Sequence, residues 1–171
     1  MDSKNKWSGK NASFNYKFFI DRINKYTKRG VHVLSNKDLY KIFEIAYSPD
    51  MLNFKNPSLL HGDLTGGNII IPSKPTKTKQ LYLFDPGELI GGDPMSDLGY
   101  TQTSRRIPEF RKGIYEGYTA EKKLSFEEET RFKKWQLLRQ CVITYRAKCL
   151  KSKKSELNVE YLKKLLNDFD K

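Results

Sequence analysis

The sequence is poor in cysteine, with two among 171 residues, which excludes a disulfide-stabilised secreted scaffold. Cys141 and Cys149 are eight positions apart in one expected helix, so about 12 Å separates them along its axis at ~1.5 Å per residue. A disulfide needs Cα atoms within about 7 Å of each other. We therefore expect two buried free thiols in a reducing compartment.

Long hydrophobic segments are also absent. No run approaches the ~18 apolar residues of a membrane-spanning helix. The first residues, MDSKNKWSGKNAS, lack the apolar segment of a signal peptide. We therefore expect a cytoplasmic protein without a membrane partner.

Acidic residues are the scarcer charged class, with 20 Asp and Glu against 32 Lys and Arg, a formal net charge of +12. Clustered basic residues would indicate a nucleic-acid partner, because they neutralise phosphates. Here they are distributed over many segments, such as Lys28-Arg29, Arg111-Lys112 and Lys151 to Lys154. This distribution favours a solvated surface, and nucleic acid is the less favoured partner.

Apolar residues recur three and four positions apart in several stretches, which is the period of an amphipathic helix. Ser13 and Ser35 are expected N-caps, and Ser125-x-x-Glu128 has the form of a capping box. The expected helices cover 14–29, 36–47, 108–118, 126–150 and 158–169. The length suggests one domain, so we expect a tail over 1–13 and one folded unit over 14–171.

Two short apolar runs between the helices are bounded by turn residues and predict strands: Ile69 to Ile71 and Leu81 to Phe84. The segment SKPTKTK between them suits a hairpin loop, and we expect Ile69 to Ile71 to form a buried strand that anchors the preceding loop in the core. Gly91-Gly92 is expected to form a turn, and Asp93-Pro94 an N-cap with proline at the first helical position. The predicted fold class is α+β, mostly helical.

The stretch LHGDLTGGNIIIP, residues 60–72, places Asp63 and Asn68 five positions apart on a glycine-rich loop, and the next strand ends at Asp85. Phosphoryl transfer from ATP needs a carboxylate to orient or deprotonate the acceptor and oxygen ligands for Mg²⁺, all on rigid elements. The spacing H-x-D-x-x-x-x-N followed by D-x-G is that of the kinase template.

Three segments in this order, HGDLTGGN, LYLFDPG and GGDPMSDLGY, resemble the aminoglycoside phosphotransferase and choline kinase superfamily. The resemblance covers about residues 55–100 and implies a protein-kinase-like C-terminal lobe. In such a lobe a short β-hairpin carries the catalytic loop and the metal-binding aspartate.

The resemblance also implies roles for individual residues. Asp63 would be the catalytic base, and Asn68 and Asp85 would be the Mg²⁺ ligands. His61, within the catalytic motif, and Asp97 would support the loop through hydrogen bonds. The other assigned positions are Asp93, as a helix cap, and Ile70 and Phe84, on the floor of the adenine pocket.

The implied function is an ATP- and Mg²⁺-dependent kinase acting on a hydroxyl of a small molecule such as an aminoglycoside, a choline-like amino alcohol or a sugar. HGDLT is also similar to the small atypical protein kinases of the tRNA-modification complex. A third possibility is a degenerate kinase lobe that serves as a basic interaction or RNA-binding module. The identity of the acceptor and the choice between ATP and GTP stay open.

The 60 residues before His61 contain no G-x-G-x-x-G and no lysine in a V-A-I-K-like strand. These are the signatures of a kinase N-terminal lobe. We expect that lobe to be absent from this chain and to be supplied by the same gene or by a separate chain. The isolated chain is then expected to bind Mg-ATP weakly and to turn over little.

Overall fold

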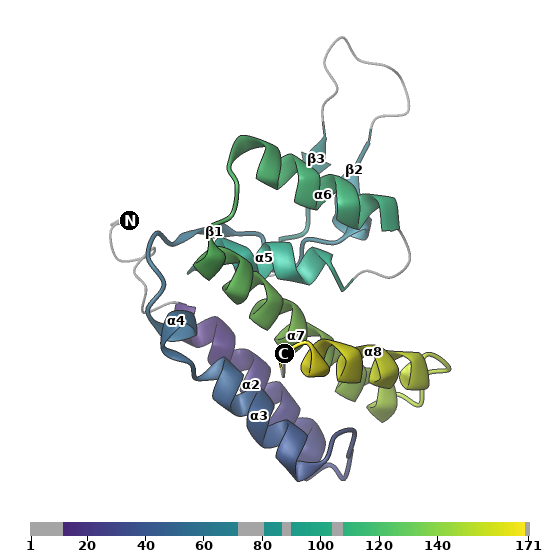
Figure 1. The fold of residues 1–171 in the computed structure, drawn as a ribbon. Helices are drawn as coiled ribbons and strands as arrows, with labels where there is room; N and C mark the ends of the chain where they lie inside the picture. The colour runs from purple at the N-terminus through teal and green to yellow at the C-terminus, as the bar shows by residue number, and fades with distance from the viewer. Residues whose placement is uncertain (1–11, 72–80, 87–89, 104–107, 170–171) are drawn as a thin grey trace.

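The computed structural model describes residues 12–71, 81–86, 90–103 and 108–169. Within these ranges the fold is mostly helical with two small antiparallel sheets, compatible with the predicted α+β class (Figure 1). The elements are α2 (Ala12–Lys28), α3 (Asn36–Ala46), α4 (Pro49–Leu52), β1 (Ser58–Leu60), the 3-10 turn η2 (Gly66–Asn68), β2 (Ile69–Ile70), β3 (Tyr82–Leu83), β4 (Ile90–Gly92), α5 (Pro94–Thr101), α6 (Pro108–Glu121), α7 (Phe126–Cys149) and α8 (Ser155–Asn167).

All five predicted helices are confirmed, with boundaries shifted by a few residues. The hydroxyl of Ser35 accepts the Asp38 N–H at the start of α3, and Ser125 and Glu128 form the predicted capping box of α7. The expected cap at Ser13 is wrong, because α2 already includes Ala12, a strong helix former. The short helix α4 was not predicted, and it begins at Pro49, which suits a first helical position.

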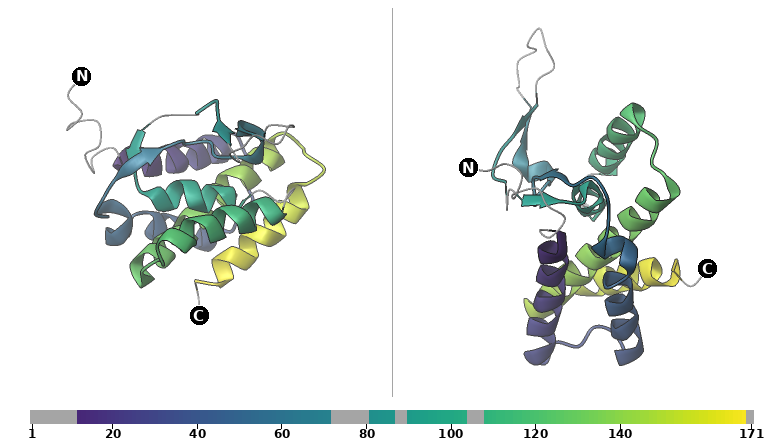
Figure 2. Two further views of the ribbon diagram at one scale, coloured as in Figure 1. Left: turned by 90° about the horizontal axis from the view of Figure 1, so that it is seen from above. Right: turned by 90° about the vertical axis from the view of Figure 1, so that its left-hand side faces the viewer.

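Helix α7 packs against most of the other helices, with α5 on one side, α2 and α3 on another, and α8 folded back along it (Figure 1). Its predicted apolar stripe is buried at Trp135, Leu138, Val142 and Tyr145. Both cysteines are free thiols, as expected. Cys141 is buried, as predicted, whereas Cys149 is only half-buried. Figure 2 shows α2 and α3 at one end of the molecule, separated in the right-hand view, and the β2–β3 hairpin at the other end.

Helices α5 and α7 approach closely at Gly99. A Cβ atom at this position would lie 2.9 Å from the backbone nitrogen of Gln136 and 2.9 Å from Cβ of Trp135. Real Cβ atoms do not come this near to backbone, so a glycine is required for the present contact between the two helices.

Strand β1 pairs with β4 in antiparallel register, with Ser58 opposite Gly92 and Leu60 opposite Ile90. This sheet was not predicted, and the expected turn at Gly91-Gly92 is wrong. Glycine is disfavoured in strands, and the partner strand is about thirty residues away, so no local pattern indicates the pairing. The sheet brings the residue before His61 beside the residues before Asp93.

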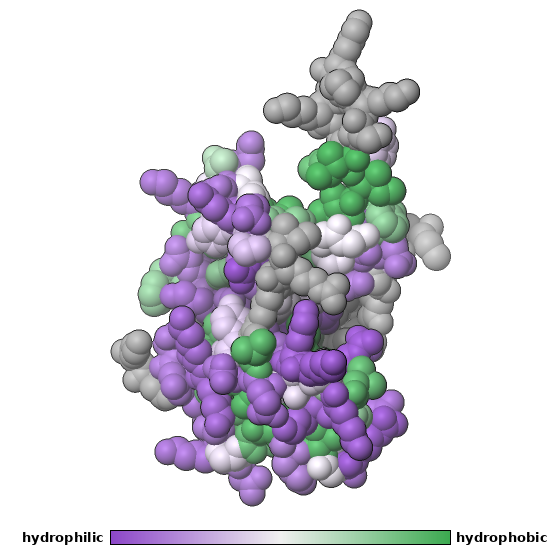
Figure 3. All heavy atoms as spheres, turned by 90° about the vertical axis from the view of Figure 1, so that its right-hand side faces the viewer, coloured by the Kyte–Doolittle hydropathy of each residue, from purple (hydrophilic) through white to green (hydrophobic). Residues whose placement is uncertain are grey.

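The predicted hairpin is confirmed, with Ile69 opposite Leu83 and Ile70 opposite Tyr82. The expectation that it is buried is wrong, since Ile70 is 51% exposed, Ile71 74% and Leu83 59%. The two-stranded hairpin extends away from the helices, and its side chains are therefore open to solvent (Figure 1). Its apolar side chains form a patch on the surface in Figure 3.

Within the described ranges, no helix combines the length and the apolar character that crossing a membrane requires.

Candidate active site

The loop that follows β1 is held by one carboxylate from α5. Oδ2 of Asp97 accepts the backbone N–H of His61 at 2.7 Å, and Oδ1 accepts that of Gly62 at 3.0 Å. Gly62 has a φ of 77°, in the left-handed region that favours glycine. Burial raises the pKa of Asp97, although these two N–H donors act in the opposite direction. Asp97 therefore connects the first residues of the loop to α5.

The ring of His61 connects the same loop to the hairpin. Its Nδ1 accepts the backbone N–H of Asp63 at 3.3 Å, and its Nε2 lies 3.1 Å from the carbonyl oxygen of Phe84. With Nδ1 as the acceptor, Nε2 carries the hydrogen that the carbonyl accepts. The ring thus fixes the loop relative to the end of β3.

Both carboxylate oxygens of Asp63 have partners. Oδ1 accepts the hydroxyl hydrogen of Tyr100 and lies 3.6 Å from Nη2 of Arg139. Oδ2 accepts from Nδ2 of Asn68 at 3.2 Å. The side chain is still 40% exposed, so it remains open to a substrate.

Asn68 connects the loop to Asp85, two residues after β3. Its Nδ2 donates to the carbonyl oxygen of Asp63 at 2.8 Å and lies 3.4 Å from that of Asp85. The opposite end of the amide, Oδ1, therefore faces away from these two carbonyls. Asp85 is exposed and has a φ of 50°, which is uncommon for a residue with a side chain.

The structure thus brings together Asp63, Asn68 and Asp85, which are up to 22 positions apart in the sequence, and supports them through His61 and Asp97. A model of the fructosamine kinase family matches residues 2–165. The chain belongs to the fructosamine kinase family. Searches of curated proteins and of solved structures gave no match.

Fructosamine kinases are a protein-kinase-like family of phosphotransferases, so membership supports the predicted kinase chemistry. It indicates an ATP-dependent small-molecule sugar kinase, and hence use of ATP. The match names neither aminoglycoside phosphotransferases nor choline kinases, so the broader superfamily expected from the motifs stays a prediction.

Asn68 and Asp85 have the ligand chemistry that Mg²⁺ requires. Mg²⁺ is held in ATP sites by one or two protein oxygens together with phosphates and water. An amide oxygen and an exposed carboxylate on neighbouring segments fit this donor set. Among the residues that the structure describes, no group of three or more His, Cys, Asp or Glu side chains gathers as a metal site.

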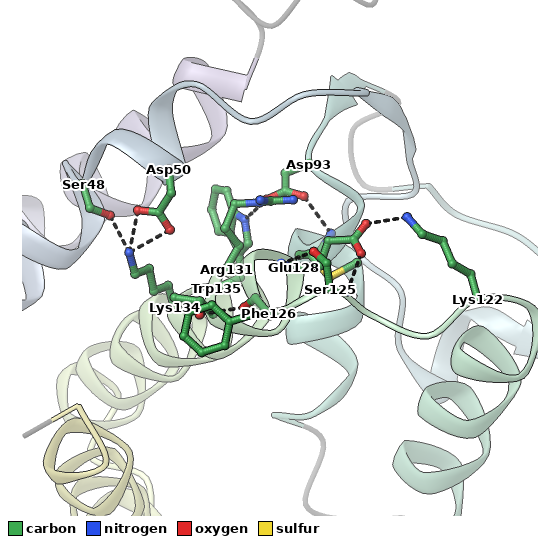
Figure 4. Close-up of polar contacts among 12 residues, drawn as sticks. Ser48, Asp50, Asp93, Lys122, Ser125, Phe126, Glu128, Arg131, Lys134 and Trp135 are labelled. Carbon is green, nitrogen blue, oxygen red and sulfur yellow. Dashed lines mark hydrogen bonds and ion pairs between the residues drawn. The ribbon is translucent and has the colours of Figure 1, made fainter. Parts of the chain in front are cut away.

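Asp93, expected as a helix cap, does more than cap α5. Its Oδ1 accepts the N–H of Met95, while Oδ2 accepts from Nε of Arg131 and from Nε1 of Trp135, both at 2.9 Å (Figure 4). The residue is only 1% exposed. This buried ion pair ties the start of α5 to α7 and so fixes the helix that carries Asp97.

Ile70 and Phe84, expected to line the adenine pocket, lie on the exposed hairpin with 51% and 42% of their surfaces accessible. The backbone N–H of Phe84 donates to the carbonyl oxygen of Asn68 at 3.1 Å. Both side chains therefore lie between Asn68 and Asp85 in the sequence, on the exposed hairpin.

Sequence reasoning missed Tyr100 and Arg139. Tyr100 lies three positions after Asp97, a spacing that puts both on one side of a helix, so a contact with the loop could have been anticipated. Arg139 belongs to a different helix, and no local pattern connects it with Asp63.

A cavity of about 270 Å³ adjoins the loop at Leu64. Its lining is mainly apolar and comes from β1, α5 and α6: Ser58, Leu59, Leu60, Pro94, Asp97, Leu98, Ile114 and Tyr118. A larger cavity of about 520 Å³ lies between the end of α4 and the start of α7, and no residue of the catalytic loop lines it.

Proposed function

We propose that this chain carries the catalytic base and the magnesium ligands of an ATP-dependent kinase that phosphorylates a hydroxyl of a sugar-derived small molecule, in the first place a fructosamine. One observation supports this most directly. The Asn68 amide joins the Asp63 carboxylate to the carbonyl oxygen of Asp85, two residues after β3. A base and two oxygen ligands thereby lie on two hydrogen-bonded segments, the catalytic loop and the residues after β3, and phosphoryl transfer requires such fixed positions.

In this proposal the acceptor hydroxyl donates its hydrogen to the carboxylate of Asp63 as its oxygen attacks the γ-phosphorus. The bond between the γ-phosphorus and the β,γ-bridging oxygen breaks, and ADP leaves with the electron pair. General base catalysis of this kind contributes about 10²- to 10⁴-fold to a rate. Oδ1 of Asn68 and the carboxylate of Asp85 would hold Mg²⁺, which neutralises charge on the β- and γ-phosphates when bound.

The exposed hairpin supports a further part of the proposal. Ile70 and Phe84 would contact the adenine ring, and an N-terminal lobe, from the same gene or a separate chain, would cover the other face of the nucleotide. Six large apolar residues of the hairpin are exposed: Ile70, Ile71, Leu81, Tyr82, Leu83 and Phe84. A surface of this kind typically marks a binding site.

The test is transfer of labelled γ-phosphate from Mg-ATP by the full chain, with and without a supplied N-terminal kinase lobe. Acceptors would be a fructose–amine adduct, free fructose, choline, an aminoglycoside and a protein. We expect Asp63→Asn to reduce transfer to the adduct by about 10²- to 10⁴-fold. Asp21→Asn, an exposed substitution on α2, is the matched control and should leave the rate unchanged.

Each other outcome points to a different function. Transfer of phosphate to the protein acceptor, and to none of the small molecules, would indicate an atypical protein kinase. No transfer under any condition, together with RNA binding that weakens steeply with salt, would indicate a basic RNA-binding module.

A further inference from the structure

We propose that Tyr100 and Arg139 are positioning residues for Asp63, which hold its carboxylate in the orientation that accepts a proton from the substrate. This inference rests on the proposed role of Asp63 as the base. Neither residue lies in HGDLTGGN, the segment that forms the catalytic loop, although Tyr100 ends the segment GGDPMSDLGY. They come from two different helices, α5 and α7.

The first argument is the distribution of contacts over the carboxylate. The terminal torsion of an aspartate is broad, so a contact to one oxygen leaves the other free to swing. Asn68 donates to Oδ2, whereas Tyr100 donates to Oδ1 and Arg139 lies on the same side at 3.6 Å. Contacts on both oxygens define the plane of the group.

The second argument is the position of Arg139. Its guanidinium carbon lies 3.4 Å from the centroid of the Tyr100 ring and 5.4 Å from that of Phe19. The side chain is only 15% exposed, and it projects from α7. A cation stacked on an aromatic face is held in place by both attraction and packing. Arg139 thereby restrains the Tyr100 ring and places its positive charge beside Asp63.

The third argument is the state of the Tyr100 hydroxyl. Burial raises the pKa of Tyr100, and the Asp63 carboxylate adds to this effect, while the nearby charge of Arg139 opposes it. The phenol therefore keeps its hydrogen at neutral pH and remains a donor to Oδ1. A carboxylate that accepts from Tyr100 and Asn68 still has lone pairs for a substrate hydroxyl.

A purely structural role makes a different prediction from a positioning role. Tyr100→Phe removes one oxygen and preserves the ring on which Arg139 stacks. If these contacts serve packing alone, stability changes and catalysis does not. If they orient the base, kcat falls while the KM for ATP stays the same, because a misplacement near 1 Å can cost about 10²-fold in rate.

The experiment compares Tyr100→Phe, Arg139→Gln and Arg139→Lys in the full chain, with the N-terminal lobe supplied if transfer requires it. We expect Tyr100→Phe to lower kcat by about 10- to 10²-fold with KM for ATP within about twofold. Arg139→Gln should lower kcat by a similar factor. Arg139→Lys keeps the charge, so its kcat should lie between those of Arg139→Gln and the wild type. Tyr40→Phe, on α3 and 66% exposed, and Arg146→Gln, exposed on α7, are the matched controls.

A second readout does not depend on activity. In chain labelled with ¹³C-aspartate, the carboxyl signal of Asp63 should shift in Tyr100→Phe and in Arg139→Gln but not in the two controls. If the wild-type chain transfers no phosphate, the proposed function fails while this shift still supports the positioning contact. An active enzyme in which Tyr100→Phe leaves both kcat and the Asp63 signal unchanged would overturn the inference.

Discussion

Nε of Arg131 donates to Oδ2 of Asp93 at 2.9 Å in a site where the aspartate is only 1% exposed. Because Asp93 also caps α5, this pair sets the position of α5 on α7. Asp97 is one turn further along α5 and accepts the first two N–H groups of the catalytic loop. The geometry of the loop thus depends on a buried ion pair outside it.

We therefore expect Asp93→Ala to lower the free energy of unfolding by about 3–5 kcal/mol, because it leaves Arg131 buried without its counter-ion. Urea unfolding followed by circular dichroism would measure this. Asp50→Ala is the comparison, since Asp50 pairs with Lys134 but its side chain is 34% exposed (Figure 4). The Asp50–Lys134 pair is half-buried, and the Ser48 hydroxyl remains as an acceptor for Lys134, so its loss should cost less than loss of the Asp93–Arg131 pair. Equal losses in the two variants would contradict the prediction.

Gly99→Ala should destabilise the protein by about 1–3 kcal/mol, because the new methyl group would meet the backbone of α7 at 2.9 Å and force the helices apart. Gly117→Ala, in α6, has no atom within 4 Å of the added Cβ. It should instead stabilise by up to about 1 kcal/mol through helix propensity. Thermal unfolding of both variants checks the pair, and a stabilised Gly99→Ala variant would show that the helices are not in close contact there.

Asp85→Gly should separate stability from activity. Asp85 has a φ of 50°, so glycine relieves backbone strain and should raise the free energy of unfolding by up to about 1 kcal/mol. It also removes a proposed Mg²⁺ ligand, so phosphoryl transfer should fall sharply. Lys151→Gly is the control, since Lys151 has the same φ of 50° at the end of α7, away from the loop. That variant should gain similar stability and keep its activity.

The capping box of α7 predicts a pH dependence. The Lys122 ammonium and the N–H of Ser125 hydrogen-bond to Glu128 and hold its pKa below the ordinary value of 4.5. A carboxyl with a depressed folded-state pKa adds stability above its unfolded-state value, and this is lost as the pH falls through the folded-state value.

Wild type should therefore exceed Glu128→Gln in stability at pH 7 by roughly 0.5–1 kcal/mol, and the two should converge near pH 3. Denaturant titrations at both values test this. Glu127→Gln, an exposed neighbour in the same first turn, is the reference. If the difference in free energy of unfolding between wild type and Glu128→Gln is the same at both pH values, the charge of Glu128 is not its source.

Much of the fold follows from local patterns. The helices were predicted because apolar spacing and caps at Ser35, Asp93 and Ser125 are encoded within a few residues. The hairpin was predicted for the same reason, since its two apolar runs are close in the chain. Burial of the hairpin was predicted wrongly, because an apolar run does not reveal which element, if any, covers it.

The candidate site divides in the same way. The sequence alone determined the kinase-type spacing of Asp63, Asn68 and Asp85, because a catalytic loop is a short continuous segment. Only the tertiary structure paired β1 with β4, joined Asp93 to Arg131, and placed Tyr100 and Arg139 against Asp63. These contacts join residues thirty or more positions apart, and they depend on the path of the chain and on close helix packing, which no local period encodes.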